Sequence, residues 1–136
     1  MNIGFDIHGV IDTDPSFYSM LINKIHDDGH IIHIITGQEQ AKVQDFLHDN
    51  EIYFDHFYSI VDYHKKINTP MYTRSDKNGW WMDGKLWRRS KGDYALYVEL
   101  DIHIDDYYGY AEYFPPTCTY IVLAENGMDR LRGMFF

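Results

Sequence analysis

The sequence has little of several features that would define other classes of protein. Cys118 is its only cysteine, so no disulfide can form within the chain, and such sparing use of cysteine favours a reducing compartment. No apolar run approaches the roughly twenty residues that a helix needs to cross a bilayer. No charged and then apolar leader opens the chain. We therefore expect a soluble, cytoplasmic protein.

Positive charge is also scarce. The chain has 12 Lys and Arg against 21 Asp and Glu, which gives a net charge of −9. Phosphate backbones and anionic lipid surfaces are bound through clusters of Lys and Arg. The composition therefore argues against broad binding of nucleic acid or of a membrane, although a local basic patch is compatible with it.

What the chain does have is the composition of a globular domain. Its 136 residues suffice for one sizeable core but not for two. Hydrophobic residues make up 45% of the chain, which excludes a disordered polypeptide. We expect one domain over residues 1–136. For the last dozen residues, a short helix and a disordered tail are both open interpretations.

Short apolar runs alternate along the chain with segments of helical periodicity. Helical spacing predicts one helix that begins at Pro15 after the cap Asp14 and ends at Gly29, and a second over residues 38–49. Strands separated by such helices indicate right-handed crossovers and a parallel sheet that is covered on both faces. The apolar runs predict five strands, at residues 2–7, 30–36, 56–61, 101–105 and 119–123.

Residues 66–90 interrupt this alternation. They contain two turn signals, Asn78-Gly79 and Asp83-Gly84, on either side of a Trp-Trp-Met run. Asp-Gly between apolar residues suits a two-residue hairpin turn. We therefore expect an inserted β-hairpin that stands off the sheet, with Asp83-Gly84 as the stronger turn signal.

The eight histidines do not predict a zinc site, because none of them stands at a metal-ligand spacing together with Cys or Glu. His33 and His103 alternate with the apolar residues of predicted strands. We expect both to pack against helices.

Polar side chains close three of the predicted strands. Asp6 lies near the end of the first strand, Thr36 ends the second, and Asp105-Asp106 ends the fourth. Ligands of open α/β sheets bind beyond the carboxyl ends of the strands, where the strand order reverses. Three carboxylates at one edge repel one another, and a phosphate would add to that repulsion, so the site requires cations.

Two kinds of cation would meet that requirement. Mg²⁺ is commonly held by one or two carboxylates. A lysine ammonium is the other, and Lys91 is the preferred candidate because it is expected to open a short helix that leads into the fourth strand. Lys65, Lys66 and Lys85 are the alternatives.

These motifs, in this order, resemble the haloacid dehalogenase (HAD) superfamily, whose phosphatases form a phospho-aspartyl intermediate. Asp6 in FDIHGVIDT is similar to the nucleophile motif, Thr36 in IIHIITG to the phosphate-binding hydroxyl, Lys91 to the motif-three lysine, and Asp105-Asp106 to the acidic metal motif. The resemblance covers the chain apart from the hairpin and the tail. It implies a Rossmann-like three-layer α/β sandwich with a mostly parallel five-stranded sheet, in the strand order 5-4-1-2-3, and a hairpin in place of a large cap.

The resemblance also implies a role for each site residue. Asp6 is the nucleophile, Thr36 holds phosphate oxygens, and Lys91 offsets negative charge on the nucleophile and the phosphoryl group. The cofactor that it implies is Mg²⁺. The metal ligands that it implies are Asp6, the backbone carbonyl of His8, Asp105 and Asp106.

His8 departs from the superfamily's pattern. Phosphatases of this superfamily usually carry a second Asp two residues after the nucleophile, which protonates the leaving group and then activates water. Imidazole can do such general acid-base work, so one interpretation is a phosphomonoesterase in which His8 takes this role. The alternative is a phosphate- or nucleotide-binding or regulatory protein with little turnover. Phosphotransfer to an acceptor other than water is a third interpretation, and it requires a protected site.

The substrate contacts are expected from the turn after the second strand and from the hairpin region. The candidates are Gly37, Arg74, Trp81 and Arg88. Interleaved Trp and Arg favour a nucleotide over other small phosphorylated substrates, although the Trp side chains could instead anchor the hairpin to the body. Exposed aromatic residues such as Tyr107 are compatible with a dimer interface, so a homodimer is one open interpretation of the oligomeric state.

Overall fold

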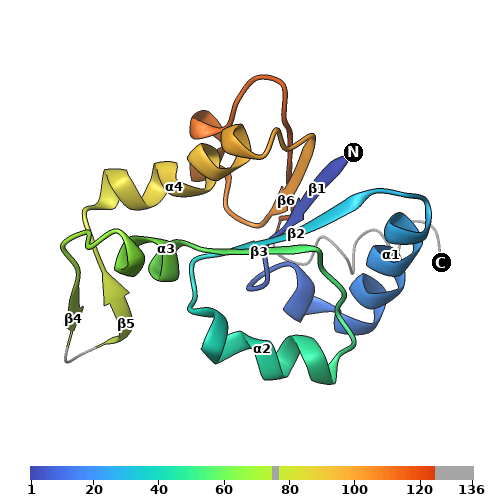
Figure 1. Cartoon of the computed structure of the whole chain (residues 1–136), viewed down its shortest axis with the longest axis horizontal. Coiled ribbons are helices and arrows are strands. Elements are labelled where there is room, and N and C mark those ends of the chain that lie inside the picture. Colours follow the sequence, from blue (N-terminus) through green and yellow to red (C-terminus); the bar gives the residue numbers. More distant parts are fainter. Residues whose placement is uncertain (75–76, 125–136) are drawn as a thin grey trace.

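The computed structural model of the protein describes residues 1–74 and 77–124 (Figure 1). The predicted tail lies outside the described residues. Among these residues no helix has the length and apolar character that crossing a membrane requires. The elements run in the order β1 (Asn2–Phe5), η1 (Ile11–Thr13), α1 (Pro15–Asp27), β2 (Ile31–Thr36), α2 (Gln40–Asp49), β3 (His56–Ser59), α3 (Ile60–Lys66), β4 (Tyr72–Arg74), β5 (Lys77–Trp81), α4 (Gly84–Tyr97), β6 (Ile102–Asp105), η2 (Tyr108–Tyr113) and β7 (Thr119–Val122).

The main sheet has five strands in the order β3-β2-β1-β6-β7, and all its neighbours are parallel. If the strands of this sheet are numbered 1 to 5 along the chain, β6 becomes strand 4 and β7 becomes strand 5. Read from β7, the order is then 5-4-1-2-3. The predicted α/β class is therefore confirmed, with a sheet that is parallel throughout. The chain moves outward from β1 on one side and from β6 on the other, so the strand order reverses between these two strands.

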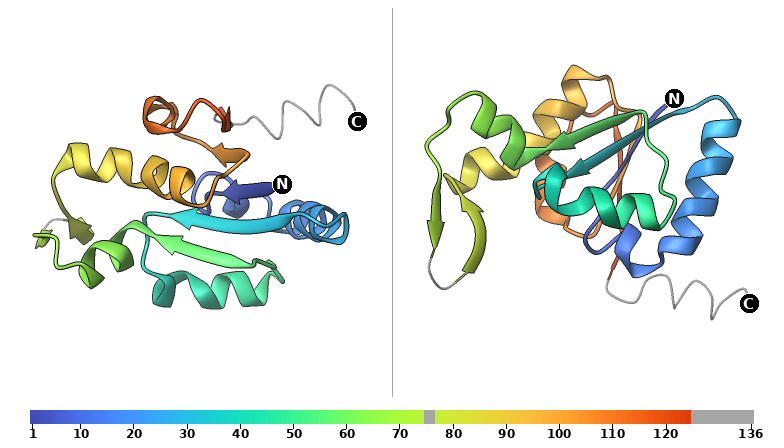
Figure 2. Two further views of the ribbon diagram at one scale, coloured as in Figure 1. Left: turned by 45° about the horizontal axis from the view of Figure 1, so that its top comes forward. Right: turned by 60° about the horizontal axis from the view of Figure 1, so that its bottom comes forward.

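Helices cover both faces of the sheet, which gives three layers (Figure 2). On β2, Ile32 and Ile34 belong to the core cluster shared with α1 and α2. Ile35 belongs to the other cluster, which includes Ala95 of α4. Because a strand points successive side chains to opposite faces, burial on both faces explains why β2 is an almost continuous apolar run.

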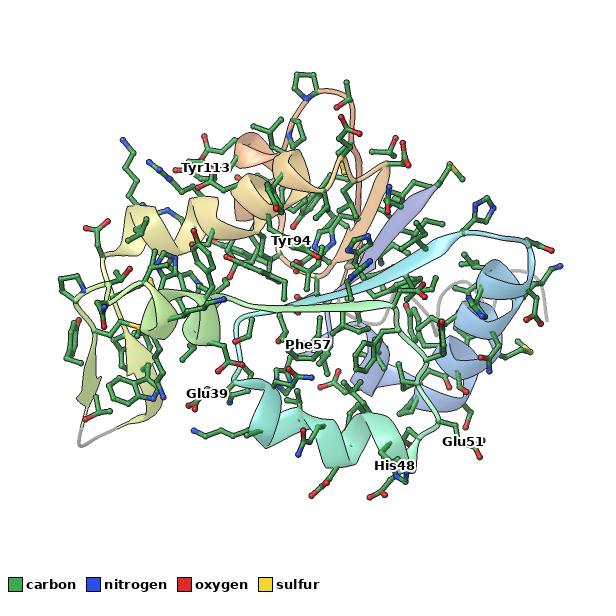
Figure 3. The ribbon with its side chains drawn as sticks, viewed as in Figure 1. Glu39, His48, Glu51, Phe57, Tyr94 and Tyr113 are labelled. Carbon is green, nitrogen blue, oxygen red and sulfur yellow. The ribbon has the colours of Figure 1, made fainter. Side chains whose placement is uncertain are left out.

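Two histidines are buried within this sheet. The expectation that they pack against helices is confirmed for His33, which contacts α4, whereas His103 packs on the residue that follows η2 and on β7. The His33 ring lies 2.8 Å from the Tyr94 hydroxyl and 2.9 Å from the Asn2 side-chain oxygen. Tyr94 extends from α4 toward the strands (Figure 3). The His103 ring stacks on Phe114, at the end of η2, with the ring centroids 4.9 Å apart.

The start of α1 is as predicted. Pro15 is its first residue, and the Asp14 side chain accepts a hydrogen bond from the Phe17 N–H. The third strand, however, was predicted too long. It ends at Ser59, whose hydroxyl oxygen accepts from the Asp62 N–H and so caps α3, a helix that the sequence analysis missed.

The predicted hairpin exists, since β4 and β5 pair in antiparallel fashion within residues 66–90. Its predicted turn at Asp83-Gly84 is wrong. Asp83 is instead the N-cap of α4, and its carboxylate accepts from the Leu86 N–H at 3.0 Å. As a consequence Lys91 lies in the middle of α4 and not at a helix start, which corrects the predicted position.

The buried His33 makes stability depend on pH. Burial, reinforced by the neighbouring His56, lowers the pKa of His33 from 6.5 to about 4. The unfolded chain therefore takes up a proton below pH 6.5 that the folded chain does not, and stability is lost as the pH falls from about 6.5 toward 4.

We expect His33→Gln to destabilise the protein by about 2 kcal/mol less at pH 5 than at pH 7, because the variant lacks this proton uptake on unfolding. Denaturant unfolding at both pH values measures the difference. His48→Gln, on the exposed end of α2 (Figure 3), is the control for removing a histidine. An equal effect of His33→Gln at both pH values would contradict a lowered pKa of His33 in the folded protein.

Candidate active site

A buried lysine lies between two buried carboxylates at the carboxyl edge of the sheet. Lys91 Nζ is 2.8 Å from Asp105 Oδ2 and 3.2 Å from Asp6 Oδ1. Lys91 is 2% exposed, Asp105 is fully buried and Asp6 is 7% exposed. Charges this deeply buried are tolerated only when they are paired. The three side chains therefore form one electrostatic unit.

The strand order brings the two carboxylates together. Asp6 directly follows β1, and its N–H donates to the Ile104 carbonyl of β6 at 3.0 Å. Asp105 is the last residue of β6. Because β1 and β6 are parallel neighbours, both side chains reach the same edge at the point where the strand order reverses.

Asp105 is held by three other donors besides Lys91. Its Oδ1 accepts from the Asp106 and Tyr107 N–H groups, and its Oδ2 accepts from His103 Nε2 at 3.0 Å. Burial alone would raise the pKa of Asp105, but the hydrogen bond from His103 and the charge of Lys91 outweigh it and hold the pKa well below its ordinary value. This carboxylate stays ionised across the physiological pH range.

The pKa of Asp6 is shifted in the opposite direction to that of Asp105. Burial raises its pKa to about 7, against the opposing charge of Lys91, and the neighbouring Asp105 adds to the rise. Burial alone would lower the pKa of Lys91, but the two carboxylates outweigh it and raise that pKa. With Lys91 alone, Asp6 is therefore only partly ionised near neutral pH.

A third carboxylate, Asp106, completes a cluster that fits a divalent cation. One oxygen from each of Asp6, Asp105 and Asp106 lies within 4.8 Å of the others. Three carboxylates and one ammonium leave two negative charges when all are ionised. An all-oxygen donor set suits Mg²⁺, and a divalent cation balances the charge that remains.

The loop after β1 approaches Asp106 closely. Gly9 has φ +82°, and a Cβ at this position would clash with the Asp106 carboxylate. Only glycine combines this left-handed backbone with so little volume. Gly9 thus allows the loop that carries His8 to sit against the carboxylate cluster.

His8 lies in this loop and faces a partner that the sequence analysis missed. His8 Nδ1 is 3.3 Å from Asp12 Oδ2, and Asp12 Oδ1 accepts from the Gly9 N–H at 2.8 Å. Since a carboxylate only accepts, the proton lies on Nδ1 and leaves Nε2 available. The His8 side chain is 62% exposed. The spacing of four residues between His8 and Asp12 was the signal that could have revealed the pair.

These groups line a cavity of about 610 Å³. Most of the predicted catalytic, metal-binding and substrate-binding residues border it, namely Asp6, His8, Thr36, Gly37, Trp81, Arg88, Lys91 and Asp106. Asp105 lies beneath them, in contact with Lys91. The side chain of Arg74 lies outside the described part of the structure, so the predicted contact of Arg74 with the substrate is not tested.

The turn after β2 contributes a hydroxyl and a close helix contact. Thr36 is fully buried, and its Oγ1 accepts from the Gln38 N–H at 3.2 Å. A Cβ at Gly37 would lie 2.6 Å from the Trp87 ring of α4. Glycine at this position therefore lets α4 close over the turn.

Aromatic side chains form a wall of the cavity, and two of them, Tyr107 and Tyr110, were not assigned to the site by the sequence analysis. Trp87 Nε1 donates to the Tyr110 hydroxyl at 3.1 Å, and the Tyr110 ring meets Tyr107 edge to face. Lys91 Nζ lies 4.8 Å from the centre of the Tyr110 ring. Tyr107 and Tyr110 belong to the segment around η2, which carries no strand or helix periodicity, so the sequence offered no signal for them.

The alternative lysines lie elsewhere. Lys65 forms an ion pair with Glu39 at 3.1 Å and lies 4.3 Å from the centre of the Trp80 ring. Glu39 marks the end of α2 nearest the hairpin (Figure 3). Among the lysines in the described ranges, Lys91 is the one that contacts the site carboxylates.

Comparisons of the chain with protein-family models, with curated proteins and with solved structures found no match. The site is therefore interpreted from its own geometry.

We expect Mg²⁺ to stabilise the folded protein, since a ligand that binds only the folded state adds about 1.4 kcal/mol at ten times its Kd. The melting temperature should rise on titration with MgCl2. Asp106→Asn should suppress most of that rise by removing one ligand, whereas Asp45→Asn, at an exposed position of α2, should retain it. Equal responses of all three proteins would contradict a metal site at Asp106.

Proposed function

We propose that this protein is a Mg²⁺-dependent phosphomonoesterase of the HAD type, which transfers a phosphoryl group to Asp6 and then to water. The observation that carries this proposal is the Lys91 ammonium between Asp6 and Asp105. Together with Asp106, it provides a nucleophile, fixed positive charge and an oxygen cluster for a cation at one cavity. Phosphoryl transfer depends on this kind of positioning and charge stabilisation.

Several groups around the cavity would bind the phosphoryl oxygens. Lys91 supplies an ammonium beside Asp6. The Thr36 Oγ1 accepts from Gln38, so its own O–H remains available as a donor. Positive charge and fixed donors around phosphorus stabilise the transition state more than the ground state, which is the condition for a faster reaction.

Asp6, Asp105 and Asp106 are the side chains that would hold Mg²⁺, with the His8 backbone carbonyl as a further ligand. When bound, the cation supplies positive charge that offsets the carboxylates and the incoming phosphate. Asp6 would then be ionised in the presence of its substrate.

The chemistry divides into two displacements at phosphorus. In the first, an Asp6 oxygen forms a bond to phosphorus while the bond to the leaving oxygen breaks, and the leaving oxygen takes a proton. In the second, water attacks the phospho-aspartate and gives up a proton, which releases inorganic phosphate and restores Asp6. The covalent intermediate replaces one difficult step by two easier ones.

His8 borders the cavity, and its Nδ1 faces Asp12. As an imidazolium, His8 would donate the Nε2 proton to the leaving oxygen, and the neutral ring that results, with its remaining proton on Nδ1, would then accept a proton from the attacking water. Asp12 fixes the tautomer and the orientation of the ring, as a carboxylate commonly does for a catalytic imidazole.

A second candidate function is supported by the position of His8. Its side chain is 62% exposed at the rim of the cavity, and its carboxylate partner is Asp12 and not Asp6. A protein in which His8 does not protonate the leaving group would bind Mg²⁺ and a phosphorylated ligand with little turnover. Such a protein would have a binding or regulatory function.

We expect the native protein to release phosphate from phosphomonoesters only when Mg²⁺ is present. Asp6→Asn should reduce that rate by more than about a thousandfold, because it removes the nucleophile while preserving shape. The assay uses a panel of nucleotide, sugar and generic phosphomonoesters, with Asp45→Asn as the matched control. Activity that survives Asp6→Asn would contradict the proposed mechanism.

The same assay on His8→Asp separates the two candidate functions. If His8 is the working acid and base, the variant should show a rate within about tenfold of the native protein, since each residue can perform the proton transfer. A gain of several orders of magnitude would indicate that the native residue suppresses turnover, and would favour the binding protein.

A further inference from the structure

The charge of the chain is distributed very unevenly. Residues 65–91 contain eight Lys and Arg against two Asp and Glu, a net charge of +6. The rest of the chain contains four Lys and Arg against 19 Asp and Glu, a net charge of −15. The overall value of −9 therefore hides a basic segment in an acidic protein.

Two described elements of this segment, β5 and α4, contribute residues to the border of the cavity. Lys65 and Lys66 end α3, and Lys85, Arg88 and Arg89 lie in the first half of α4; all five are exposed. The hairpin joins these two helices (Figure 1). We call these five side chains the basic rim. Two of them are ion-paired at 3.1 Å, Lys65 with Glu39 and Arg89 with Asp93. Arg88 is the rim residue that borders the cavity.

Aromatic side chains border the same cavity as Arg88 of the rim. They are Trp80 and Trp81 of the hairpin, Trp87 of α4, and Tyr107 and Tyr110, of which Tyr110 contacts Trp87. Lys65 of the basic rim lies 4.3 Å from the centre of the Trp80 ring, so cation and aromatic surface adjoin directly. A ligand in this cavity therefore has a cation, aromatic rings, Lys91 and Asp6 around it.

We infer that the ligand of this site is the phosphorylated end of a single-stranded nucleic acid. The inference rests on the proposed function for the position of the terminal phosphate, beside Lys91 and Asp6. The terminal base then stacks on the aromatic walls, and the next phosphodiesters reach the basic rim. Alternation of stacking surfaces and cations is how proteins hold single strands.

The charge distribution favours a strand end over the other phosphomonoesters. A mononucleotide can stack its base on the aromatic walls but has no second phosphate for the rim, whereas a strand end supplies both. The acidic remainder of the protein repels a longer polyanion, which restricts contact to the first few nucleotides. This restriction reconciles a nucleic-acid ligand with a net charge of −9.

The test measures binding of oligothymidylates of one to six nucleotides to Asp6→Asn by quenching of tryptophan fluorescence, with Mg²⁺ present. Strands with a 5′-phosphate, a 3′-phosphate or no terminal phosphate are compared. We expect affinity to rise about tenfold from one to four nucleotides, and to require the terminal phosphate. Raising KCl from 50 to 200 mM should weaken tetranucleotide binding about tenfold and mononucleotide binding about threefold, because each neutralised phosphate adds to the salt dependence.

Charge variants identify the surface that is responsible. The double variant Lys66→Gln/Lys85→Gln should weaken tetranucleotide binding about fivefold and reduce its salt dependence, while leaving mononucleotide binding unchanged. Lys24→Gln removes an exposed lysine from α1 and serves as the matched control. Affinity that is independent of strand length, or a double variant that behaves like Lys24→Gln, would overturn the inference.

The outcomes also separate this inference from the phosphatase. Length-dependent binding without phosphate release by the native protein would support the strand-end ligand and contradict the phosphatase. Hydrolysis of mononucleotides and tetranucleotides with equal kcat/KM, together with length-independent binding, would support the phosphatase and overturn the strand-end ligand.

Discussion

The architecture of the site depends on one buried ammonium shared by two carboxylates. Removing one partner from such a pair leaves an uncompensated buried charge and costs about 3 to 5 kcal/mol. Lys91 therefore fixes α4 against the edges of β1 and β6 through Asp6 and Asp105. The same helix carries Trp87, which holds Tyr110 of η2 by a hydrogen bond. The position of the aromatic wall thus follows from the position of the lysine.

This arrangement gathers three carboxylates and one ammonium at one edge of the sheet. Asp105 is held ionised by its donors, whereas burial raises the pKa of Asp6 to about 7. Two adjacent carboxylates with opposite pKa shifts are typical of sites that have a chemical task. In the proposed function the task of Asp6 is nucleophilic attack, and additional positive charge from a cation is what makes Asp6 a carboxylate when phosphate arrives.

The parts of the fold and site that the sequence predicted are those set by strand periodicity. Asp6, Thr36 and Asp105 were placed at one edge because parallel strands bring their carboxyl ends together. Asp83 was misinterpreted because Asp-Gly suits both a hairpin turn and a helix cap, and local sequence does not separate the two. Tyr110 was missed because only tertiary packing of η2 on α4 brings it to Lys91.

The most direct test of the central claim is to locate the phosphoryl group during turnover. Native protein is mixed with a phosphomonoester that it hydrolyses and Mg²⁺, the reaction is quenched in acid, and the peptides are analysed by mass spectrometry. The proposed mechanism predicts one phosphoryl group on Asp6, and none on the corresponding peptide of Asp6→Asn. A phosphoryl group on His8 or another residue, or steady phosphate release without any phosphorylated peptide, would contradict it.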